Sequence, residues 1–132
     1  MRIAAIFATT VALTSISASA FACSCMRQTP EDQARMSQSI FVGVPVRTQS
    51  MGGRERMTTF RVTDSLKGKG LVQYIYHLEN DGGNCGVSFR SSKPILVTAS
   101  VVEGKLRTNA CSMPQADEDA FRAILSGKRK RK

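Results

Sequence analysis

The chain has 132 residues, 42% of them hydrophobic, and a formal net charge of +9 at pH 7. This length suits one domain and excludes a chain of several, and the excess of base favours acidic partners such as polysaccharide, an anionic envelope surface or extracellular nucleic acid. After the first stretch, no segment approaches 18 uninterrupted apolar residues, so no transmembrane segment is predicted.

Residues 1–22 have the layout of a secretory signal peptide. Arg2 supplies the positive start, residues 3–16 are apolar except for Thr and Ser, and small residues follow. We therefore expect an exported protein, secreted or periplasmic. Removing residues 1–22 leaves 110 residues and, because Arg2 is the only charge lost, lowers the net charge from +9 to +8.

Two cleavage sites of the A-x-A type overlap in this leader. Residues 18–20 would release Phe21 as the first residue, whereas residues 20–22 would release Cys23. A lipoprotein cut is a third alternative, but Ala20 stands where leucine is preferred, and acylation would consume the amine. We expect cleavage between Ala22 and Cys23.

All four cysteines lie after the leader, at Cys23, Cys25, Cys85 and Cys111. An even number in an oxidising compartment favours two disulfides, for which three connectivities exist. In an extended segment, residues i and i+2 point the same way. Cys23 and Cys25 would then face the domain together and Ser24 would face outward, so that two bridges would tie the N-terminus to the domain.

The first elements of the domain are a helix and a strand. Thr29 is suited to cap a short helix over residues 29–39, and Pro30 suits its first position. Residues 39–48 follow as a strand. Its alternation places four side chains on one face: Ile40, Val42, Val44 and Val46. Pro45 predicts an edge position or a bulge because it has no N–H to donate.

Four further strands and a second helix complete the pattern. Residues 57–66 alternate, with Phe60, Val62 and Leu66 on one face and Thr59, Arg61 and Thr63 on the other. Residues 71–78, 94–102 and 105–111 are rich in strand formers, and residues 79–86 have the composition of a loop. A last helix begins with the acidic residues 117–119, has Phe121, Ile124 and Leu125 at helical spacing, and ends at Gly127.

These elements predict an all-β domain over residues 23–127: a small five-stranded barrel with a short N-terminal helix and a C-terminal helix. Residues 128–132 are expected to be a basic disordered tail.

The residue patterns contain little that supports catalysis. His77 is the only histidine and lies in a strand pattern, where a structural or surface role is more common than a ligand role. Three carboxylates, Asp64, Glu79 and Asp81, are scattered, and no metalloprotease, phosphate-loop or nucleophile-elbow motif is present. We predict that the protein is not an enzyme, and that it has no cofactor and no specific nucleic-acid partner.

Several segments, in order, resemble the inhibitory N-terminal domain of the tissue inhibitors of metalloproteinases (TIMPs), within the netrin-module superfamily. They are "CSC" directly after the leader, "SIFVGVPV", "TTFRVTDSLKG", "NCGVSF", "KPILVTASVVEGKL" and "RTNACS". The similarity covers nearly all of residues 23–113, and it is closer still to exported bacterial proteins of this superfamily. Three features depart from the animal inhibitors: their third disulfide is missing, Met26 and Arg27 stand where proline is common, and their cysteine-rich second domain is absent.

The resemblance implies an OB-fold-like Greek-key barrel with disulfides Cys23–Cys85 and Cys25–Cys111. It also implies a metalloprotease inhibitor in which the α-amine and carbonyl of Cys23 chelate the target's zinc and displace its catalytic water. Ser24 would enter the specificity pocket beside the metal. The implied inhibitory ridge consists of six residues: Cys23, Ser24, Cys25, Met26, Gly83 and Asn84.

Two alternatives remain at this level. The first is a secreted OB-fold module without inhibitory activity, which uses its net charge and the tail of residues 127–132 to bind acidic polysaccharide or envelope components. The second is copper handling by Cys23, Cys25 and Met26, which requires reduced thiols.

Overall fold

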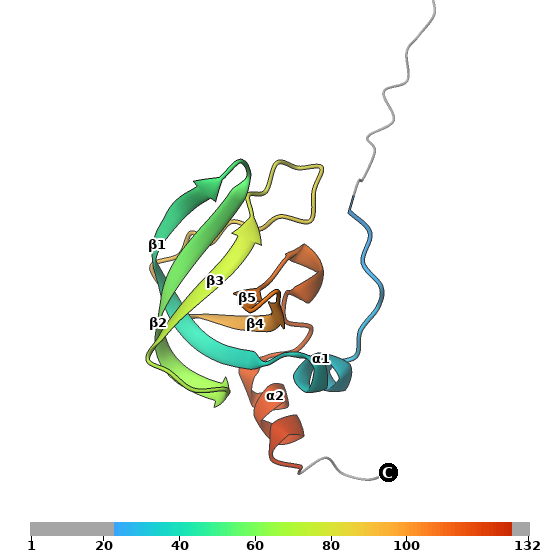
Figure 1. The fold of residues 1–132 in the computed structure, drawn as a ribbon. Helices are drawn as coiled ribbons and strands as arrows, with labels where there is room; N and C mark the ends of the chain where they lie inside the picture. Colours follow the sequence, from blue (N-terminus) through green and yellow to red (C-terminus); the bar gives the residue numbers. More distant parts are fainter. Residues whose placement is uncertain (1–22, 128–132) are drawn as a thin grey trace, which may run out of the picture.

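The computed structural model describes residues 23–127, so the predicted signal peptide (1–22) and basic tail (128–132) lie outside the described residues. The order of elements follows the sequence prediction (Figure 1). The elements are α1 (Pro30–Met36), β1 (Ser39–Gly52), β2 (Glu55–Lys67), β3 (Val72–Leu78), β4 (Ile95–Val102), β5 (Lys105–Arg107), the 3-10 helix η1 (Ala110–Ser112) and α2 (Glu118–Leu125).

Within residues 23–127, five strands form a closed barrel in the order β1-β2-β3-β5-β4. Every neighbouring pair is antiparallel except β3 and β5, which run parallel and share the single pair Tyr76–Arg107. This Greek-key arrangement confirms the predicted fold class, a small OB-fold-like barrel with a helix at each end of the chain. No helix in this part of the chain is long and apolar enough to cross a membrane.

The barrel interior is filled by one cluster of buried apolar side chains. Its members are Phe41, Phe60, Ile75, Val97 and Ala99, each at most 1% exposed. The ring of Phe60 meets Phe41 and Phe89 edge to face, with centroids 5.4 Å and 5.0 Å away. Such arrangements add to the stabilisation that the burial of the rings provides.

The two helices close one end of the barrel through a second cluster (Figure 1). Ala34 from α1, Ile40 from β1 and Phe121 from α2 are buried against one another. Both predicted helix starts are confirmed, because the side chains of Thr29 and Asp117 accept backbone N–H groups of α1 and α2. Gly127 follows α2 with a φ of 70°, which suits glycine after a helix end.

The predicted alternation of the first strand, with Ile40 and Val46 on the same face, does not hold along its length. β1 is longer than predicted, and its register against β2 shifts near Ile40, Val42, Pro45 and Ser50. Phe41 and Ile40 are therefore both buried, the first in the barrel interior and the second against the helices, whereas Val42 and Val44 are half-buried and Val46 is 56% exposed. The shift beside Pro45 confirms the predicted bulge, because an extra residue there moves the next side chains to the other face.

The predicted faces of the second strand are confirmed. Phe60 is fully buried and Val62 packs against the core, while Arg61 and Thr63 are exposed. The last strand, β5, ends at Arg107, and Cys111 follows it in η1. Cys111 therefore lies in a tight turn after the last strand.

Candidate functional site

Two disulfides fasten the start of the described chain to the barrel. Cys23 is bonded to Cys85 and Cys25 to Cys111, with a Cα–Cα distance of 5.2 Å in each pair. This is the connectivity that the TIMP resemblance implies, and it includes every cysteine of the chain. The copper alternative requires thiolates, which these disulfides do not offer.

The two disulfides are in direct contact with each other. The Sγ atom of Cys111 lies 3.7 Å from that of Cys23 and 3.9 Å from that of Cys85. A backbone hydrogen bond from the N–H of Ala110 to the carbonyl of Cys85, at 2.8 Å, holds their two loops together. Cys23 and Cys25 therefore bond to two cysteines, Cys85 and Cys111, that lie next to each other.

The turn that carries Cys111 is organised by Asn109. Its side-chain oxygen accepts the N–H groups of Cys111 at 2.8 Å and Ser112 at 3.1 Å, so it caps η1. Sequence reasoning did not single out Asn109. Asparagine is a preferred capping residue, so Asn109, two residues before Cys111, could have predicted a capped turn at this cysteine.

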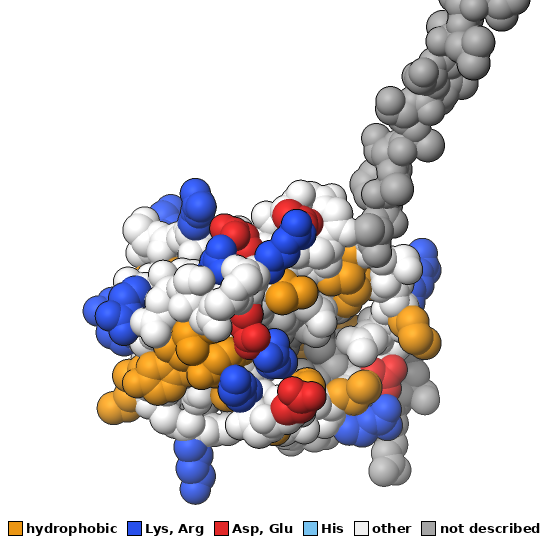
Figure 2. Space-filling view, turned by 45° about the horizontal axis from the view of Figure 1, so that its top comes forward, with side chains coloured by type: hydrophobic (Ala, Val, Ile, Leu, Met, Phe, Trp, Pro, Cys, Tyr) orange, Lys and Arg blue, Asp and Glu red, His pale blue; other side chains and the backbone are white. Residues whose placement is uncertain are grey.

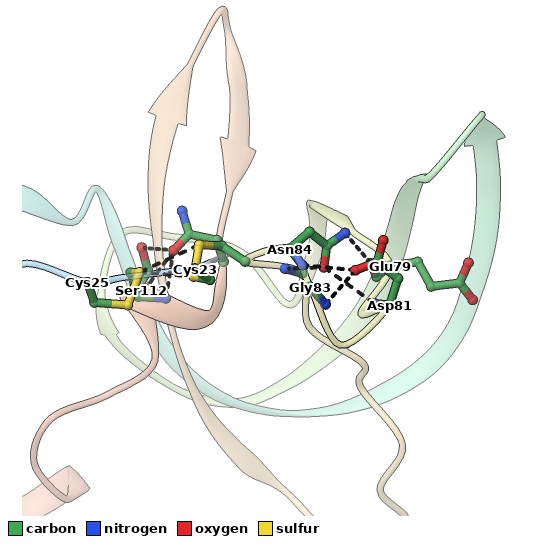
Figure 3. Close-up of a disulfide and its surroundings, with 11 residues drawn as sticks. Cys23, Cys25, Glu79, Asp81, Gly83, Asn84 and Ser112 are labelled. Atoms are coloured by element: carbon green, nitrogen blue, oxygen red, sulfur yellow. Dashed lines mark hydrogen bonds between the residues drawn. A yellow bond between two sulfur atoms is a disulfide. The ribbon is translucent and has the colours of Figure 1, made fainter. Parts of the chain in front are cut away.

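Cys85 lies at the end of a loop, residues 79–86, that holds its own shape (Figure 3). Asp81 Oδ1 accepts the N–H groups of Gly83 and Asn84, both at 2.9 Å. The side chain of Asn84 donates to the carbonyl of Glu79 at 2.8 Å and accepts the N–H of Gly86 at 2.9 Å. The amide of Asn84 is thereby occupied inside its own loop.

Gly86 allows this loop to close. A Cβ at position 86 would lie 2.3 Å from the carbonyl oxygen of Glu79, a separation that no side chain can adopt. The N–H of Val87 then bonds the carbonyl of Leu78 at 3.0 Å and seals the base of the loop. A glycine directly after Cys85 is thus required by close backbone approach rather than by an unusual φ.

The same loop is joined to the hairpin between β1 and β2. Arg54 forms an ion pair with Asp81, and Arg56 forms one with Glu79 at 2.5 Å. Asp64 pairs with Arg122 of α2. The three carboxylates that the sequence showed as scattered therefore each serve a separate ion pair with arginine, and the structure brings together no carboxylate pair from them.

The residues of the predicted ridge lie at one edge of the molecule. Ser24, Cys25 and Met26 are exposed, with Met26 exposed to 90%, and Cys23 is half-buried. The Cys23–Cys85 bond brings them beside the half-buried Gly83 and Asn84, which directly precede Cys85. We call this set of six residues the N-terminal edge.

A buried glutamine, which sequence reasoning missed, joins α1 to the segment after Cys111. Gln33 is 3% exposed, and its amide nitrogen donates to the carbonyls of Ser112 at 3.2 Å and Met113 at 2.9 Å. Its amide oxygen accepts the N–H of Gln115 at 3.0 Å. No local pattern marks Gln33, because all three partners lie about 80 residues away in sequence.

His77 is a structural histidine of the barrel. It is 2% exposed, its Nε2 lies 2.7 Å from the hydroxyl of Thr58, and its Nδ1 lies 3.1 Å from the carbonyl of Leu78. Since a carbonyl can only accept, Nδ1 carries the proton and Nε2 accepts from Thr58. Burial is the main cause that lowers the pKa of His77 below its ordinary value.

The comparisons with known proteins do not assign this chain to a family. A scan against models of known protein families gives no match, and a search of curated proteins gives none either.

Proposed function

We propose that the mature protein is a TIMP-like inhibitor that presents its N-terminal edge to the active site of a zinc metalloprotease. The observation that carries this proposal is the pair of contacting disulfides, which holds Cys23 and Cys25 on either side of the exposed Ser24. The protein would act as a binding partner and would not itself catalyse a reaction.

The rigidity of this edge supports the proposal. Each disulfide closes a long segment, with a sequence separation of 62 for Cys23–Cys85 and of 86 for Cys25–Cys111. Both attachment points belong to loops that hydrogen bonds hold in place, through Asn84 and Asn109. A segment that is fixed before binding loses little conformational entropy on entering a cleft, which favours affinity.

The chemistry depends on where the leader is cleaved. If Cys23 is the first residue, its α-amine has an ordinary pKa of about 8 and is partly neutral at neutral pH. A neutral amine and the adjacent carbonyl can together bind the zinc of a target, which keeps an open position for water. Two extra residues before Cys23 would turn this amine into an amide, which cannot bind zinc in that way.

The test compares three preparations of the mature protein against a panel of zinc endopeptidases. The first begins at Cys23, the second carries one added alanine before Cys23, and the third has its α-amine carbamylated by cyanate at mildly acidic pH. We expect inhibition by the first form and at least a hundredfold weaker inhibition by the other two. Thermal unfolding of all three should coincide, because neither change touches the disulfides.

Two outcomes would overturn the proposal. One is the absence of inhibition by the form that begins at Cys23, with both disulfides confirmed by mass spectrometry. The other is equal inhibition by the alanine-extended form, which would show that the amine is not the ligand.

A further inference from the structure

One side of the barrel exposes aromatic and aliphatic side chains of β3, a strand that pairs with β2 along its whole length. On β3, Ile75 and His77 point inward, while Val72 and Tyr74 are 48% and 55% exposed on the outer side. Leu71, directly before the strand, is 82% exposed. A contiguous exposed patch of this kind marks an interaction site more often than isolated apolar residues do.

Cations surround this patch. Arg47 lies opposite Thr59 across the sheet, and Thr59 lies opposite Tyr74, so all three share the outer side. Arg61 lies opposite Val72 in the same way. Figure 2 shows hydrophobic side chains gathered at the lower left with Lys and Arg side chains around them.

Further positive charge comes from β5. The ammonium group of Lys105 lies 4.7 Å from the centre of the Tyr76 ring, and the guanidinium of Arg107 lies 5.9 Å from it. We call Arg47, Arg61, Val72, Tyr74, Tyr76 and Lys105 the outer sheet face.

The charge of the outer sheet face is not neutralised. Among residues 23–127, Arg47, Arg61 and Lys105 form no ion pair, and Arg107 is paired with Glu55 at 2.5 Å. The acid nearest to Lys105 along the chain is Glu103, in the turn before it. Three cations that form no ion pair within residues 23–127 favour an anionic partner.

A hollow lies next to the outer sheet face, on the side of the hairpin that β4 and β5 form. Because β3 and β5 share only the pair Tyr76–Arg107, the first half of β3 has no strand on that side. An open hollow of about 470 Å³ lies there, lined by apolar atoms of Met57 and Leu106 and by Tyr74, Tyr76 and Lys105. Its open form suits a chain that passes across it better than a small molecule that must be enclosed.

We propose that the outer sheet face binds an acidic polysaccharide, a chain of sugar rings that carry carboxylate or sulfate groups. The cations match its charges, and the ring of Tyr74 offers a flat surface to the C–H face of a sugar. In barrels of the OB type, the face of the second and third strands is a common position for oligosaccharide and oligonucleotide ligands. This surface is separate from the N-terminal edge and does not depend on its proposed function.

A single-stranded nucleic acid fits the same face less well. Such ligands need aromatic rings whose faces are free to stack on bases. Here Lys105 and Arg107 lie over the ring of Tyr76, where a base would stack. A cation in that position can instead bind the carboxylate of a sugar acid or the sulfate of a sulfated sugar.

The experiment measures binding by isothermal titration calorimetry to four probes: an oligogalacturonate, a heparin-derived oligosaccharide, a neutral maltooligosaccharide and oligo(dT). We expect binding to one or both acidic oligosaccharides, weakened by salt, and none to the neutral one. Preference for the first or the second probe tells whether carboxylate or sulfate is recognised.

Matched variants locate the site. Arg61→Gln/Lys105→Gln removes two charges from the outer sheet face, whereas Arg90→Gln/Lys93→Gln removes two exposed charges elsewhere, and both keep the basic C-terminal residues. We expect at least a tenfold loss of affinity in the first variant and less than a twofold loss in the second. Tyr74→Ala, which changes no charge, should weaken binding by a similar factor to the first.

Three results would overturn the proposal: no binding to either acidic oligosaccharide, equal losses in the two double variants, or tighter binding of oligo(dT) than of both. If Arg61→Gln/Lys105→Gln fails to fold, the single variant Arg47→Gln, at an exposed position, replaces it.

Discussion

The sulfur of Cys111 lies 3.7 Å from the sulfur of Cys23, although the two belong to different disulfides. A thiolate attacks a disulfide sulfur that it can reach, forms a new bond to it and releases the other cysteine as a thiolate. In Cys25→Ser, Cys111 would be a free thiol beside the Cys23–Cys85 bond, 3.9 Å from Cys85. We expect exchange to Cys23–Cys111 and Cys85–Cys111 forms.

Peptide mapping without reduction checks this exchange. The mixture should grow with time at pH 8, where more of the thiol is ionised, and should be trapped by alkylation under acidic conditions. Cys25→Ser/Cys111→Ser, which lacks the attacking thiol, serves as the control and should keep only Cys23–Cys85. A single, unchanged disulfide in Cys25→Ser after hours at pH 8 would contradict the contact between the sulfur of Cys111 and the Cys23–Cys85 bond.

Gly86 should tolerate no side chain. Gly86→Ala places a Cβ against the carbonyl of Glu79, so the loop that carries Cys85 must open or shift. We expect a loss of about 1–3 kcal/mol in the free energy of unfolding, as for other overpacked sites. Urea denaturation measures it. Gly83→Ala is the matched control, because its nearest neighbour lies at 3.7 Å, and its loss should stay below about 1 kcal/mol.

Gln33 should matter more for stability than an exposed glutamine does. Gln33→Leu keeps the size of the side chain but removes its three hydrogen bonds, and it leaves the N–H of Gln115 without its partner. The loss of these partly buried hydrogen bonds should lower the free energy of unfolding by about 1–3 kcal/mol. Thermal and urea unfolding should show this loss, whereas Gln115→Ala, which removes one exposed hydrogen bond, should change it little. Equal effects of the two variants would speak against the role of Gln33.

Stability should fall as the solution becomes acidic, through His77. Burial lowers the folded-state pKa of His77 below the ordinary value of 6.5, so near that pH the unfolded chain binds the proton more readily. The stabilisation is thus present above pH 6.5 and is lost as pH falls below it. The positive charge of Arg56 also lowers the pKa of His77.

Urea denaturation between pH 5.5 and pH 7.5 tests the titration. His77→Gln has no titrating group at this position and can still accept from Thr58. We expect a smaller loss of stability on acidification in this variant than in the wild type. Parallel curves for the two proteins would assign the pH dependence to other groups.

The parts of the fold that sequence analysis predicted correctly are those set by neighbours in the chain. Thr29 and Asp117 start their helices through hydrogen bonds that span three residues, so both helix starts could be predicted. The alternation around Phe60 placed one face of β2 inward, because β2 is regular there. The same reasoning failed for β1, where the shifts against β2 depend on a partner strand that the pattern of β1 does not contain.

Local patterns in the sequence were enough to predict the five strands, the two helices, the candidate N-terminal edge and enough cysteines for two disulfides. Three relationships appear only in the folded chain: Cys85 and Cys111 are neighbours, Gln33 fastens α1, and Tyr74 shares a face with Arg47. Helix capping and strand alternation act over a few residues and leave a local pattern. Contacts between loops and across a barrel depend on the register of distant strands, which a single sequence does not display.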